Sequence, residues 1–485
     1  MSKRPLLLAG IPILLFWLVM MALVLRRELG TPQLPPPARS DLAARETWLA
    51  FTLADGRRIG TLHARSTPQA RGGRAGVALS LRSRLQLDLL GRPSEMRMTG
   101  SAWRPLDGGD LRFRFDVRSG DHALTVAGRV ADGLLDARVT SAGETVPLRL
   151  PVDRHLAFGG GFGSLLELPV LDEGEVYRMT GFDPLTLHAT SVRVRGAGRE
   201  TVRIGGERVE GRLLVVESGG LSSRVLVDER GELLRAETPF GLRLERLSPQ
   251  QALAPGAADQ GADLLAATAV VPRGKRPFRG ARELRFAVGG IGDRTLPSDD
   301  HQRREGGERY RVLAAGEPGD PPPDLGPYLA AEPLVQSDHP SIRTRALAIA
   351  GDLQDPLARA QRLNDWLFAE LDKEVVLSVP SALEVLRSRR GDCNEHAVLF
   401  TALARALELP ARIAVGLVWS DELGAFYYHA WPEVWIADRW LRFDPTLGQA
   451  PADATHLKLL TGGIAAWPQL LAFLGSLEID VLEVE

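Results

Sequence analysis

Residues 381–420 read SALEVLRSRRGDCNEHAVLFTALARALELPARIAVGLVWS, and residues 425–446 read AFYYHAWPEVWIADRWLRFDPT. These two segments contain the only cysteine of the 485-residue chain, Cys393, and after it His429 and Asp444. A cysteine, a histidine and a carboxylate are the components of an activated-thiol site. The patterns around each of the three residues decide whether the chain can bring them together.

Cys393 is predicted to open a helix. Asp392, directly before it, is a favourable N-cap residue, and Glu395 three positions later completes a capping-box pattern. Apolar residues then recur at helical spacing, at Val398, Leu399, Ala402, Leu403, Ala406 and Leu407. In the first turn, unpaired N–H groups and the helix dipole favour an anion, so we expect a lowered pKa for the thiol. His396, on the same helix, is a rival candidate base.

His429 and Asp444 fall on two neighbouring predicted strands. The first spans residues 426–436 and the second residues 439–443. Pro445 ends the second strand because proline cannot continue the hydrogen-bond ladder. The two strands are close enough in sequence to form a hairpin.

The length of the hairpin turn decides whether the two side chains meet. If the turn consists of residues 437–438, Asp444 faces Trp431 across the pair and is the diagonal neighbour of His429 on the same face. A carboxylate in that position can hold the tautomer of the imidazole. A three-residue turn would reverse this parity.

Three motifs in this order resemble the core of the transglutaminase-like superfamily, which has a papain-like α/β fold. They are Gly391-Asp392-Cys393, His429-Ala430-Trp431-Pro432-Glu433 and Asp444-Pro445-Thr446. The resemblance covers residues 326–460. It implies that Cys393 is the nucleophile, that His429 transfers the proton and that Asp444 orients His429.

Two further residues take supporting positions in the same motifs, Asp392 beside the nucleophile and Trp431 beside the histidine. One feature departs from the family pattern, because Pro432 falls inside the predicted strand. Proline cannot donate to a neighbouring strand, so this position indicates an edge strand.

Composition sets limits on the class of protein. The hydrophobic fraction of 44% and the charged fraction of 25% are typical of a globular protein, and the length predicts two or three domains. The net charge of -2 gives no indication of a nucleic-acid partner. His339, His429 and His456 lack ligand partners at metal-binding spacing, and no phosphate-binding loop is present. We therefore expect neither a metal nor a cofactor.

The N-terminus predicts a membrane anchor. Residues 5–25 are apolar, are flanked by basic residues and are long enough to cross a bilayer. No cleavage-site pattern follows, so residues 1–28 are interpreted as an uncleaved signal anchor, and the proline-rich residues 29–47 as a spacer. We expect a single-pass inner-membrane protein whose body lies in the periplasm.

The rest of the chain predicts an α+β protein. Apolar and polar residues alternate through residues 48–247, which favours antiparallel strands with one face in water. The predicted organisation is a transmembrane helix, an antiparallel β-rich domain (48–247), a mixed β and loop connector (248–325), a papain-like transglutaminase core in which the cysteine helix packs on an antiparallel sheet (326–460), and a helix-strand tail (461–485).

The predicted activity is acyl transfer. The Cys393 thiolate would attack a carboxamide or peptide carbonyl of a protein or peptide substrate, such as a cell-wall peptide. Water as acceptor gives cysteine peptidase-like or amidase-like hydrolysis in the cell envelope, the outcome that the superfamily resemblance favours in bacteria. The alternatives are a non-catalytic envelope binding or assembly module and a protein-crosslinking transglutaminase.

Overall fold

The computed structural model describes residues 44–53, 56–89, 92–107, 110–152, 156–158, 168–219, 221–238, 242–253, 269–292, 294–318, 324–374, 379, 381–463, 470, 473 and 476–485. The expected membrane anchor over residues 5–25 lies outside these residues and stays a prediction. In the part of the chain that is described, no helix has the length and apolar character needed to cross a membrane.

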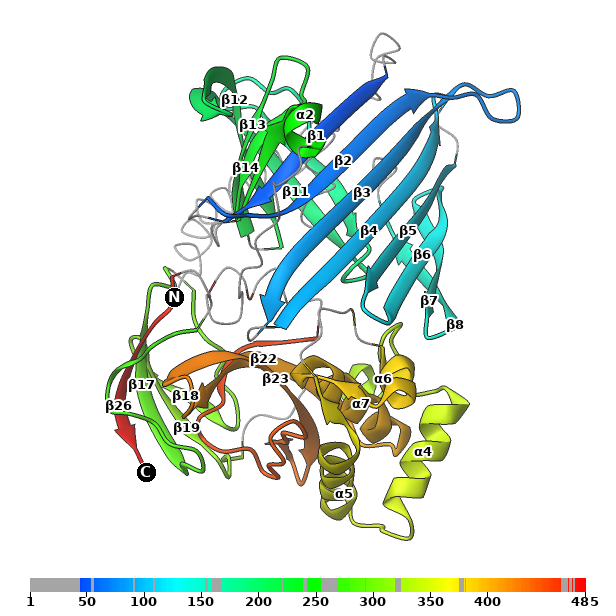
Figure 1. The fold of residues 1–485 in the computed structure, drawn as a ribbon. Coiled ribbons are helices and arrows are strands. Elements are labelled where there is room, and N and C mark those ends of the chain that lie inside the picture. Colours follow the sequence, from blue (N-terminus) through cyan, green and yellow to red (C-terminus); the bar gives the residue numbers. More distant parts are fainter. Residues whose placement is uncertain are drawn as a thin grey trace, which may run out of the picture.

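Among the described residues, fifteen strands form one large curved sheet, which occupies the upper half of Figure 1. Chain neighbours pair antiparallel, except that β9 and β10 pair parallel and that β8 and β9, at opposite edges, do not pair. The strands are β1 (Arg45–Thr52), β2 (Arg58–Pro68), β3 (Gly76–Leu89), β4 (Arg92–Pro105), β5 (Leu111–Ser119), β6 (His122–Ala131), β7 (Leu134–Ser141), β8 (Glu144–Pro151), β9 (Leu156–Phe158), β10 (Val176–Asp183), β11 (His188–Ile204), β12 (Glu207–Ser218), β13 (Leu221–Val227), β14 (Leu233–Glu237) and β15 (Arg243–Leu247).

The alternation of side chains explains why these segments form a sheet with two different faces. In β5, Leu111, Phe113 and Val117 are buried, whereas Arg112 and Arg114 between them are exposed. This period of two places apolar side chains on the core and arginines in water. The predicted antiparallel β character of the N-terminal half is therefore confirmed.

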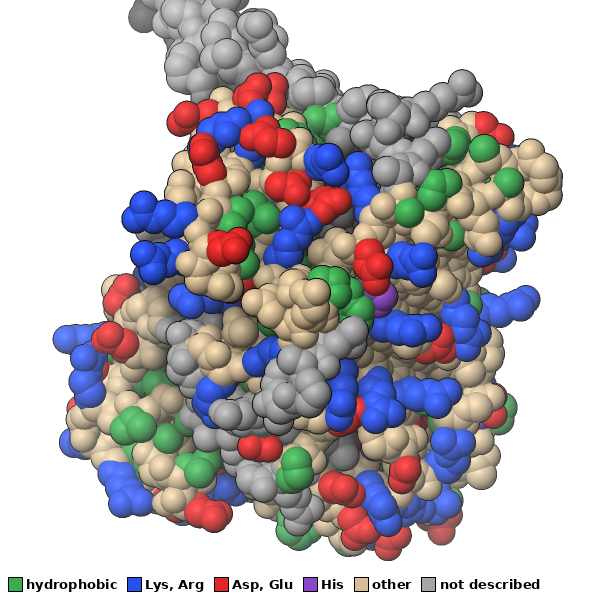
Figure 2. Space-filling view, turned by 45° about the horizontal axis from the view of Figure 1, so that its top comes forward, with side chains coloured by type: hydrophobic (Ala, Val, Ile, Leu, Met, Phe, Trp, Pro, Cys, Tyr) green, Lys and Arg blue, Asp and Glu red, His purple; other side chains and the backbone are tan. Residues whose placement is uncertain are grey.

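The exposed charges of the molecule carry both signs. Figure 2 shows Lys and Arg side chains interspersed with Asp and Glu over the face it presents. Several face each other across strands, such as Arg84 with Glu95 at 2.8 Å and Arg224 with Glu200 at 2.7 Å. Exposed pairs of this kind contribute little to stability, on the order of 0–1 kcal/mol each.

One pairing joins the two ends of the large sheet's sequence. β1 pairs with β15 in antiparallel register from Trp48 opposite Leu247 to Thr52 opposite Arg243. The edge strands are therefore β8 and β9, which come from the middle of this region. This long-range pair makes residues 45–247 one continuous sheet.

In the C-terminal part, the described residues form two larger sheets and one strand pair (Figure 1). A four-stranded sheet has the order β24-β23-β22-β25, a five-stranded sheet the order β16-β26-β17-β19-β18, and β20 pairs with β21. The strands are β16 (Arg273–Gly274), β17 (Glu283–Gly289), β18 (Gln302–Gly306), β19 (Arg309–Leu313), β20 (Asp372–Lys373), β21 (Arg390–Gly391), β22 (Ala411–Ser420), β23 (Ala425–Ile436), β24 (Arg439–Arg442), β25 (Leu457–Thr461) and β26 (Glu478–Val484).

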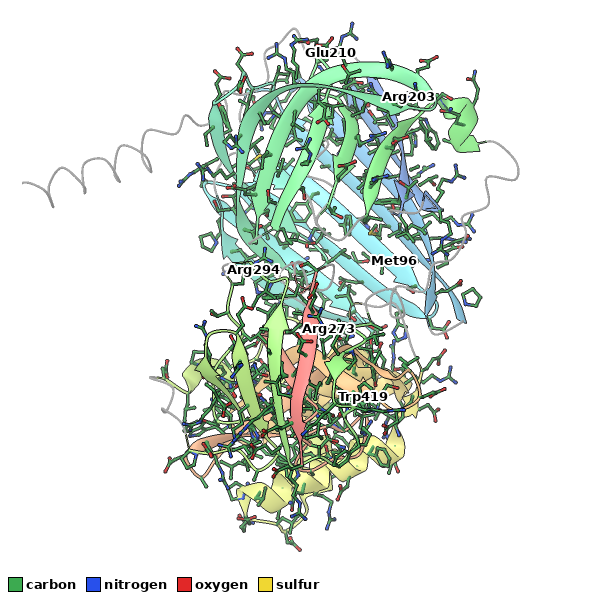
Figure 3. The ribbon with its side chains drawn as sticks, turned by 90° about the vertical axis from the view of Figure 1, so that its left-hand side faces the viewer. Met96, Arg203, Glu210, Arg273, Arg294 and Trp419 are labelled. Carbon is green, nitrogen blue, oxygen red and sulfur yellow. The ribbon has the colours of Figure 1, made fainter. Side chains whose placement is uncertain are left out.

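The five-stranded sheet changes the interpretation of two predicted segments. Residues 248–325, expected as a connector, and residues 461–485, expected as a tail, supply its strands together. β26 lies between β16 and β17, and Arg273 holds it through an ion pair with Asp480 at 2.7 Å (Figure 3). Sequence periodicity misses this because the paired strands are about 190 residues apart.

Helix α7 (Cys393–Ala406), with α5 (Pro356–Glu370) beside it, packs on the four-stranded sheet, and two further helices, α4 (Pro340–Ala350) and α6 (Ala382–Ser388), pack on α7. The short α2 (Pro249–Leu253) and the 3₁₀ helix η3 (Gly326–Tyr328) lie elsewhere. α7 is the central one, since it contacts α4, α5 and α6 on one side and β22 and β23 on the other. The predicted packing of the cysteine helix on an antiparallel sheet is confirmed.

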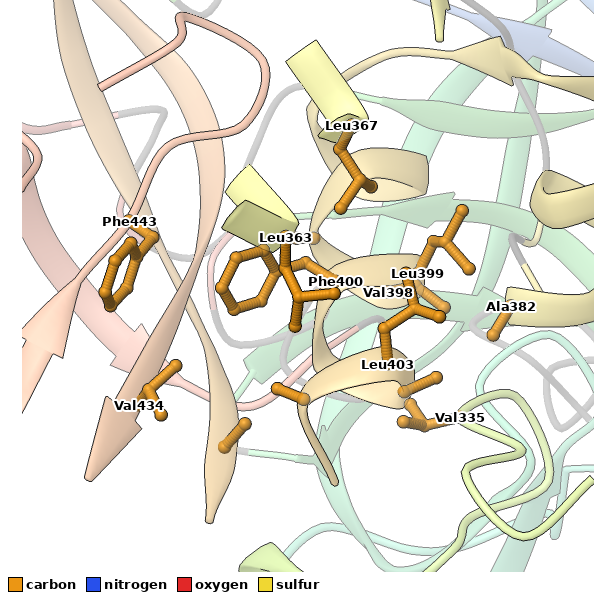
Figure 4. Packing of buried hydrophobic residues seen from close by; sticks show 14 of the residues in the cluster. Val335, Leu363, Leu367, Ala382, Val398, Leu399, Phe400, Leu403, Val434 and Phe443 are labelled. Atoms are coloured by element: carbon orange, nitrogen blue, oxygen red, sulfur yellow. The ribbon is translucent and has the colours of Figure 1, made fainter. Parts of the chain in front are cut away.

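The apolar core around α7 sets the position of the helix. Leu399 and Leu403 pack toward Val335 and Ala382, while Phe400 points toward the sheet (Figure 4). Phe400 stacks on Phe443 with ring centroids 5.5 Å apart. Phe443 directly precedes Asp444, so this one contact ties the cysteine helix to the strand end that carries the carboxylate.

The large sheet contacts the helices through α6. Glu384 accepts a hydrogen bond from Ser141 at 2.7 Å and lies 3.0 Å from the ring of His122, while Arg387 donates to the backbone oxygen of Ala142. Ser381 caps α6 by accepting the backbone N–H of Glu384, but the Glu384 side chain does not turn back to the cap. The side chain joins the two parts of the molecule instead.

Strand β26, which lies between β16 and β17 in the five-stranded sheet, provides a stability test. Ile479 in β26 is 2% exposed, so Ile479→Ala should lower the free energy of unfolding by about 2 to 5 kcal/mol through lost burial and a residual cavity. Leu482 in the same strand is 40% exposed, and Leu482→Ala should change it by less than about 0.5 kcal/mol. Urea unfolding measures both, and equal effects would show that β26 does not fill this place in the sheet.

Candidate active site

Cys393 is the first residue of α7, as predicted. The Asp392 carboxylate accepts the backbone N–H of Asn394 at 2.9 Å, and Glu395 reaches back to accept the N–H of Asp392 at 3.0 Å. This capping box satisfies backbone donors that the first helical turn leaves unpaired. It also fixes the direction in which the cysteine side chain leaves the helix.

The surroundings of the thiol correct one expectation. Cys393 is only 8% exposed, and burial raises the pKa of its thiol well above the ordinary value, with the charge of Asp392 adding to the effect. The helix start was expected to lower this pKa, but burial and the nearby carboxylates outweigh it. The backbone N–H of Ala430, which directly follows His429, acts in the other direction by hydrogen bonding to the sulfur.

The hairpin that carries His429 and Asp444 turns on two residues, as its predicted parity required. Ile436 pairs with Arg439, and the residues between them, Ala437 and Asp438, have φ values of 50° and 57°. Two left-handed residues form the type I′ turn that matches the twist of paired strands. The register therefore brings the side chains of His429 and Asp444 together.

Pro432 does not mark an edge strand, contrary to the expectation. β23 is an inner strand, with β22 on one side and β24 on the other. The backbone oxygen of Pro432 accepts the N–H of Phe443, just beyond the end of β24 at Arg442. Because the N and O of one residue face the same neighbouring strand, the missing N–H falls where β24 has ended.

The Asp444 carboxylate is fully buried and accepts four hydrogen bonds. One oxygen, Oδ2, accepts from His429 Nε2 at 2.8 Å and from His456 Nε2 at 2.9 Å. The other, Oδ1, accepts the backbone N–H groups of Thr446 and Leu447 at 3.0 and 2.9 Å. Burial alone would raise the pKa of Asp444, but the two histidines outweigh it and hold the pKa below its ordinary value, so the group stays ionised.

This arrangement determines the tautomer of His429. An ionised carboxylate only accepts hydrogen bonds, so His429 must carry a proton on Nε2. The lone pair of the neutral ring is then on Nδ1. A base in this form can accept a proton from a thiol.

His456 is the site residue that sequence reasoning missed. It lies in the segment before β25, is completely buried and contacts Asp444 with one ring nitrogen and Asp453 with the other. The only signal in the sequence is an Asp-x-x-His spacing, which is too common to single it out. Long-range folding brings it to Asp444.

The same residues define the group within the described part of the chain that could hold a metal ion. Ligand atoms of His429, Asp444 and His456 all lie within 4.8 Å of one another, a set not expected from sequence spacing. The two hydrogen bonds onto Asp444 Oδ2 account for this closeness without an ion.

His396, the rival candidate for the base, is bound to the backbone of its own helix. Its Nδ1 contacts the backbone oxygen of Asp392 at 2.7 Å, one helical turn back, and burial lowers the pKa of the ring. A ring held on its own helix start supports the cap. His429, by contrast, is oriented by a side chain from another strand.

Aromatic residues pack around the two histidines and the start of α7. The ring of Trp431 lies 6.3 Å from that of His429 in stacked orientation and 5.2 Å from that of His456, edge-on. The hydroxyl of Tyr428 donates to the Asn394 side chain at 2.6 Å and so connects β23 to the residue after Cys393. These contacts hold both rings and the helix start in place.

A buried ionic cluster supports the strands below the site. Glu433, on the same strand as His429, accepts from Lys458 at 2.6 Å and from Arg412 at 2.7 Å. Lys458 also contacts Asp299 at 2.7 Å, which links β25 to the five-stranded sheet. Burial would raise the pKa of Glu433, but Lys458 and Arg412 lower it to about 2.

Removing the charge of Glu433 tests this cluster. At pH 7, Glu433→Gln should cost about 3 to 5 kcal/mol of stability, because it leaves buried cations without a partner. The folded-state pKa is depressed, so the contribution is present above the unfolded value near 4.5 and is lost as the pH falls toward 2. Wild type and variant should therefore converge in urea unfolding as the pH drops below about 4.5.

Glu483 provides the matched control for this experiment. It pairs with Arg285 at 3.1 Å but is half exposed, so Glu483→Gln should change stability by less than about 1 kcal/mol at any pH. If Glu433→Gln behaved like Glu483→Gln, the buried cluster would not support the strands.

Comparison with known proteins identifies the domain that holds these residues. Residues 343–445 match the family model of the transglutaminase-like superfamily, so the chain contains a transglutaminase-like domain there, and the resemblance inferred from its motifs is confirmed. The matched range contains Cys393, His429 and Asp444, whereas His456 lies beyond it. No match to this sequence is found among curated proteins.

Solved structures with partial similarity include three bacterial proteins. A candidate cysteine protease from Cytophaga hutchinsonii is 18% identical, with a TM-score of 0.28 over 43% of this chain and 85% of its own. A β-barrel-like protein of unknown function from Brucella abortus is 11% identical, with a TM-score of 0.30 over 43% and 97%. A candidate protease from Parabacteroides distasonis is 10% identical, with a TM-score of 0.20 over 77% and 64%.

Proposed function

We propose that this protein is a thiol-dependent acyl-transfer enzyme that acts on a carboxamide or peptide bond of a protein or peptide. One observation carries the proposal. Cys393 begins a helix, the backbone N–H of Ala430 acts to lower the pKa of its thiol, and His429, the residue before Ala430, is held from behind by the ionised Asp444. This arrangement supports Cys393 as the nucleophile, His429 as the base and Asp444 as the group that orients the base.

The chemistry follows from these roles. His429 takes the thiol proton on Nδ1, and the Cys393 sulfur attacks the carbonyl carbon to form a tetrahedral oxyanion. The N–H of Cys393 at the helix start supports that oxyanion. The His429 imidazolium then gives its proton to the leaving amine as the C–N bond breaks, which leaves a thioester. Water, deprotonated by His429, releases the acid and restores the thiol.

The acceptor of the acyl group distinguishes the two enzymatic alternatives. Water gives a cysteine peptidase-like or amidase-like hydrolase, and an amine gives a crosslinking transglutaminase. We favour hydrolysis in the cell envelope, with protein or cell-wall peptides as substrates. Incubation with peptide libraries with and without an added primary amine separates the two by the mass of the product.

Alkylation of the only cysteine tests the site without a known substrate. Burial raises the pKa of the Cys393 thiol, so an isolated thiol here should react with iodoacetamide only at alkaline pH. If His429 forms a thiolate–imidazolium pair, alkylation should continue at mildly acidic pH, and His429→Ala should abolish that reaction. Mass spectrometry counts the label, and Cys393→Ala gives the unlabelled control.

The mutational pattern should separate an enzyme from a non-catalytic envelope binding module. Cys393→Ala should abolish turnover with little loss of stability, since it removes one sulfur atom. Asp444→Asn should lower turnover by keeping the shape but presenting the wrong hydrogen bond to His429. Slow alkylation that does not depend on His429 would favour the binding module.

We also propose that residues 5–25 anchor the protein in the inner membrane with its body in the periplasm. The proline-rich spacer should separate the anchor from the sheet that begins at Arg45. Deleting residues 1–27 should therefore give a protein that stays in solution without detergent and keeps the thermal midpoint of the full chain. Aggregation of the shortened protein would mean that the apolar run packs on the body.

A further inference from the structure

His456 and Asp453 extend the chain of side chains behind the thiol. His429 contacts Asp444, Asp444 contacts His456, and His456 contacts Asp453 with its other ring nitrogen, Nδ1, at 3.3 Å from Oδ1. All four side chains are buried, with exposed fractions between 0% and 6%. His456 and Asp453 lie outside the three motifs that resemble the transglutaminase-like superfamily.

We propose that His456 is a positioning residue of the thiol site, which holds Asp444 in the orientation that fixes His429 and does so as an imidazolium. This inference rests on the proposed function, because it assigns a role within the same acyl-transfer site. It adds a second histidine and a second carboxylate to the three expected residues.

The hydrogen-bond partners of His456 favour donation by both of its ring nitrogens. Asp444 Oδ2 faces its Nε2, and Asp453 Oδ1 and the Asp453 backbone oxygen face its Nδ1 at 3.3 and 3.1 Å. These oxygens accept hydrogen bonds, so both ring nitrogens make favourable contacts only if both carry protons. Burial would lower the pKa of His456, but the hydrogen bonds that it donates to Asp444 and Asp453 raise it overall.

A second buried histidine shows why the two carboxylates matter. His301 also lies between two oxygens, those of Leu313 at 2.9 Å and Trp440 at 2.8 Å, but both belong to uncharged backbone groups. Burial, together with the charge of Arg442, lowers the pKa of His301 to about 4. Negative charge on both sides is what distinguishes His456.

Asp453 is itself fixed, so it can hold His456 in place. Its Oδ2 accepts the backbone N–H of Gly280 at 2.9 Å and the side-chain amide of Gln449 at 2.7 Å, and Arg279 lies 3.6 Å away. Gln449 also forms two backbone hydrogen bonds with Asp444, at 2.8 and 2.9 Å. The ring Asp444–His456–Asp453–Gln449 is therefore closed.

The consequence for the site is electrostatic as well as steric. The charged groups around His456 are Asp444, Asp453 and, through Asp444, His429, with Arg442 donating to the backbone oxygen of His456 at 3.0 Å; Trp431 lies edge-on and is uncharged. A cation at His456 offsets part of the negative charge of Asp444, which opposes formation of the nearby thiolate. Removing that cation should make the thiolate harder to form and the imidazolium at His429 easier to form.

The test is the pH dependence of Cys393 alkylation by iodoacetamide in the full chain. His456→Gln keeps an amide donor toward Asp444 but loses the charge, so the pH of half-maximal alkylation should rise by about one unit. His456→Leu loses the donor as well, so the maximal rate should also fall roughly tenfold to a hundredfold, as for other groups that orient a reacting residue. His301→Gln, which replaces an equally buried but neutral histidine, should leave the profile unchanged.

The alkylation experiment can contradict the proposed function and the role of His456 independently. If alkylation of the wild type does not depend on His429, the proposed function fails. If it does depend on His429 but His456→Gln has the wild-type profile, only the present inference fails. His456→Gln and His301→Gln could also lose the same thermal stability, with no shift in the pH profile of alkylation. His456 would then have a structural role alone. A stoichiometric metal ion that is present in the wild type and lost in His456→Gln would also overturn the inference. A His456 nitrogen that ligates a metal carries no proton and cannot donate to a carboxylate.

Discussion

A carboxylate that is buried away from water must be supplied with hydrogen-bond donors, and the Asp444 carboxylate obtains four of them. Two come from the backbone just after Asp444, where the chain turns at the end of its strand. The other two come from His429, on the neighbouring strand, and from His456, in the segment before β25. Because an ionised carboxylate only accepts, this one residue fixes the position of two rings and the protonation of the ring nitrogens that face it.

The packing around α7 determines whether that geometry reaches the thiol. The stacked rings of Phe400 and Phe443 connect the helix that begins with Cys393 to the residue before Asp444, and Tyr428 ties the strand of His429 to Asn394. Close-packed cores shift little, so these contacts hold the sulfur and the imidazole on elements with a defined relative position. Below the same strand, Glu433 and Lys458 lie at the centre of a buried ionic cluster that reaches Asp299 of the adjoining part. The large sheet adds a further support through Glu384 on the neighbouring helix.

The thiol shows how two opposing physical effects meet at one atom. The helix start and the N–H of Ala430 favour a thiolate, whereas burial and the carboxylates nearby disfavour it, and the second group of effects dominates in this structure. If Cys393 acts as the proposed nucleophile, its thiolate depends on a neighbouring cation, and the charge distribution behind His429 then matters for the reaction. The buried pair of His456 and Asp453 belongs to that distribution, although neither residue is part of the three motifs that identify the domain.

The sequence by itself determined the features that depend on neighbours along the chain. The capping residues around Cys393 set the helix start, and the alternation of apolar and polar residues set the antiparallel strands. The sequence also limited the register of Asp444 and His429 to a choice between two turn lengths, and the structure has the two-residue turn. Each follows from hydrogen bonding or periodicity within a few residues. Only the tertiary structure decided the burial that raises the thiol pKa, the inner position of Pro432, the five-stranded sheet built from residues about 190 positions apart, and the contact of His456 with Asp444. These depend on which distant segments pack together, and no local pattern encodes that choice.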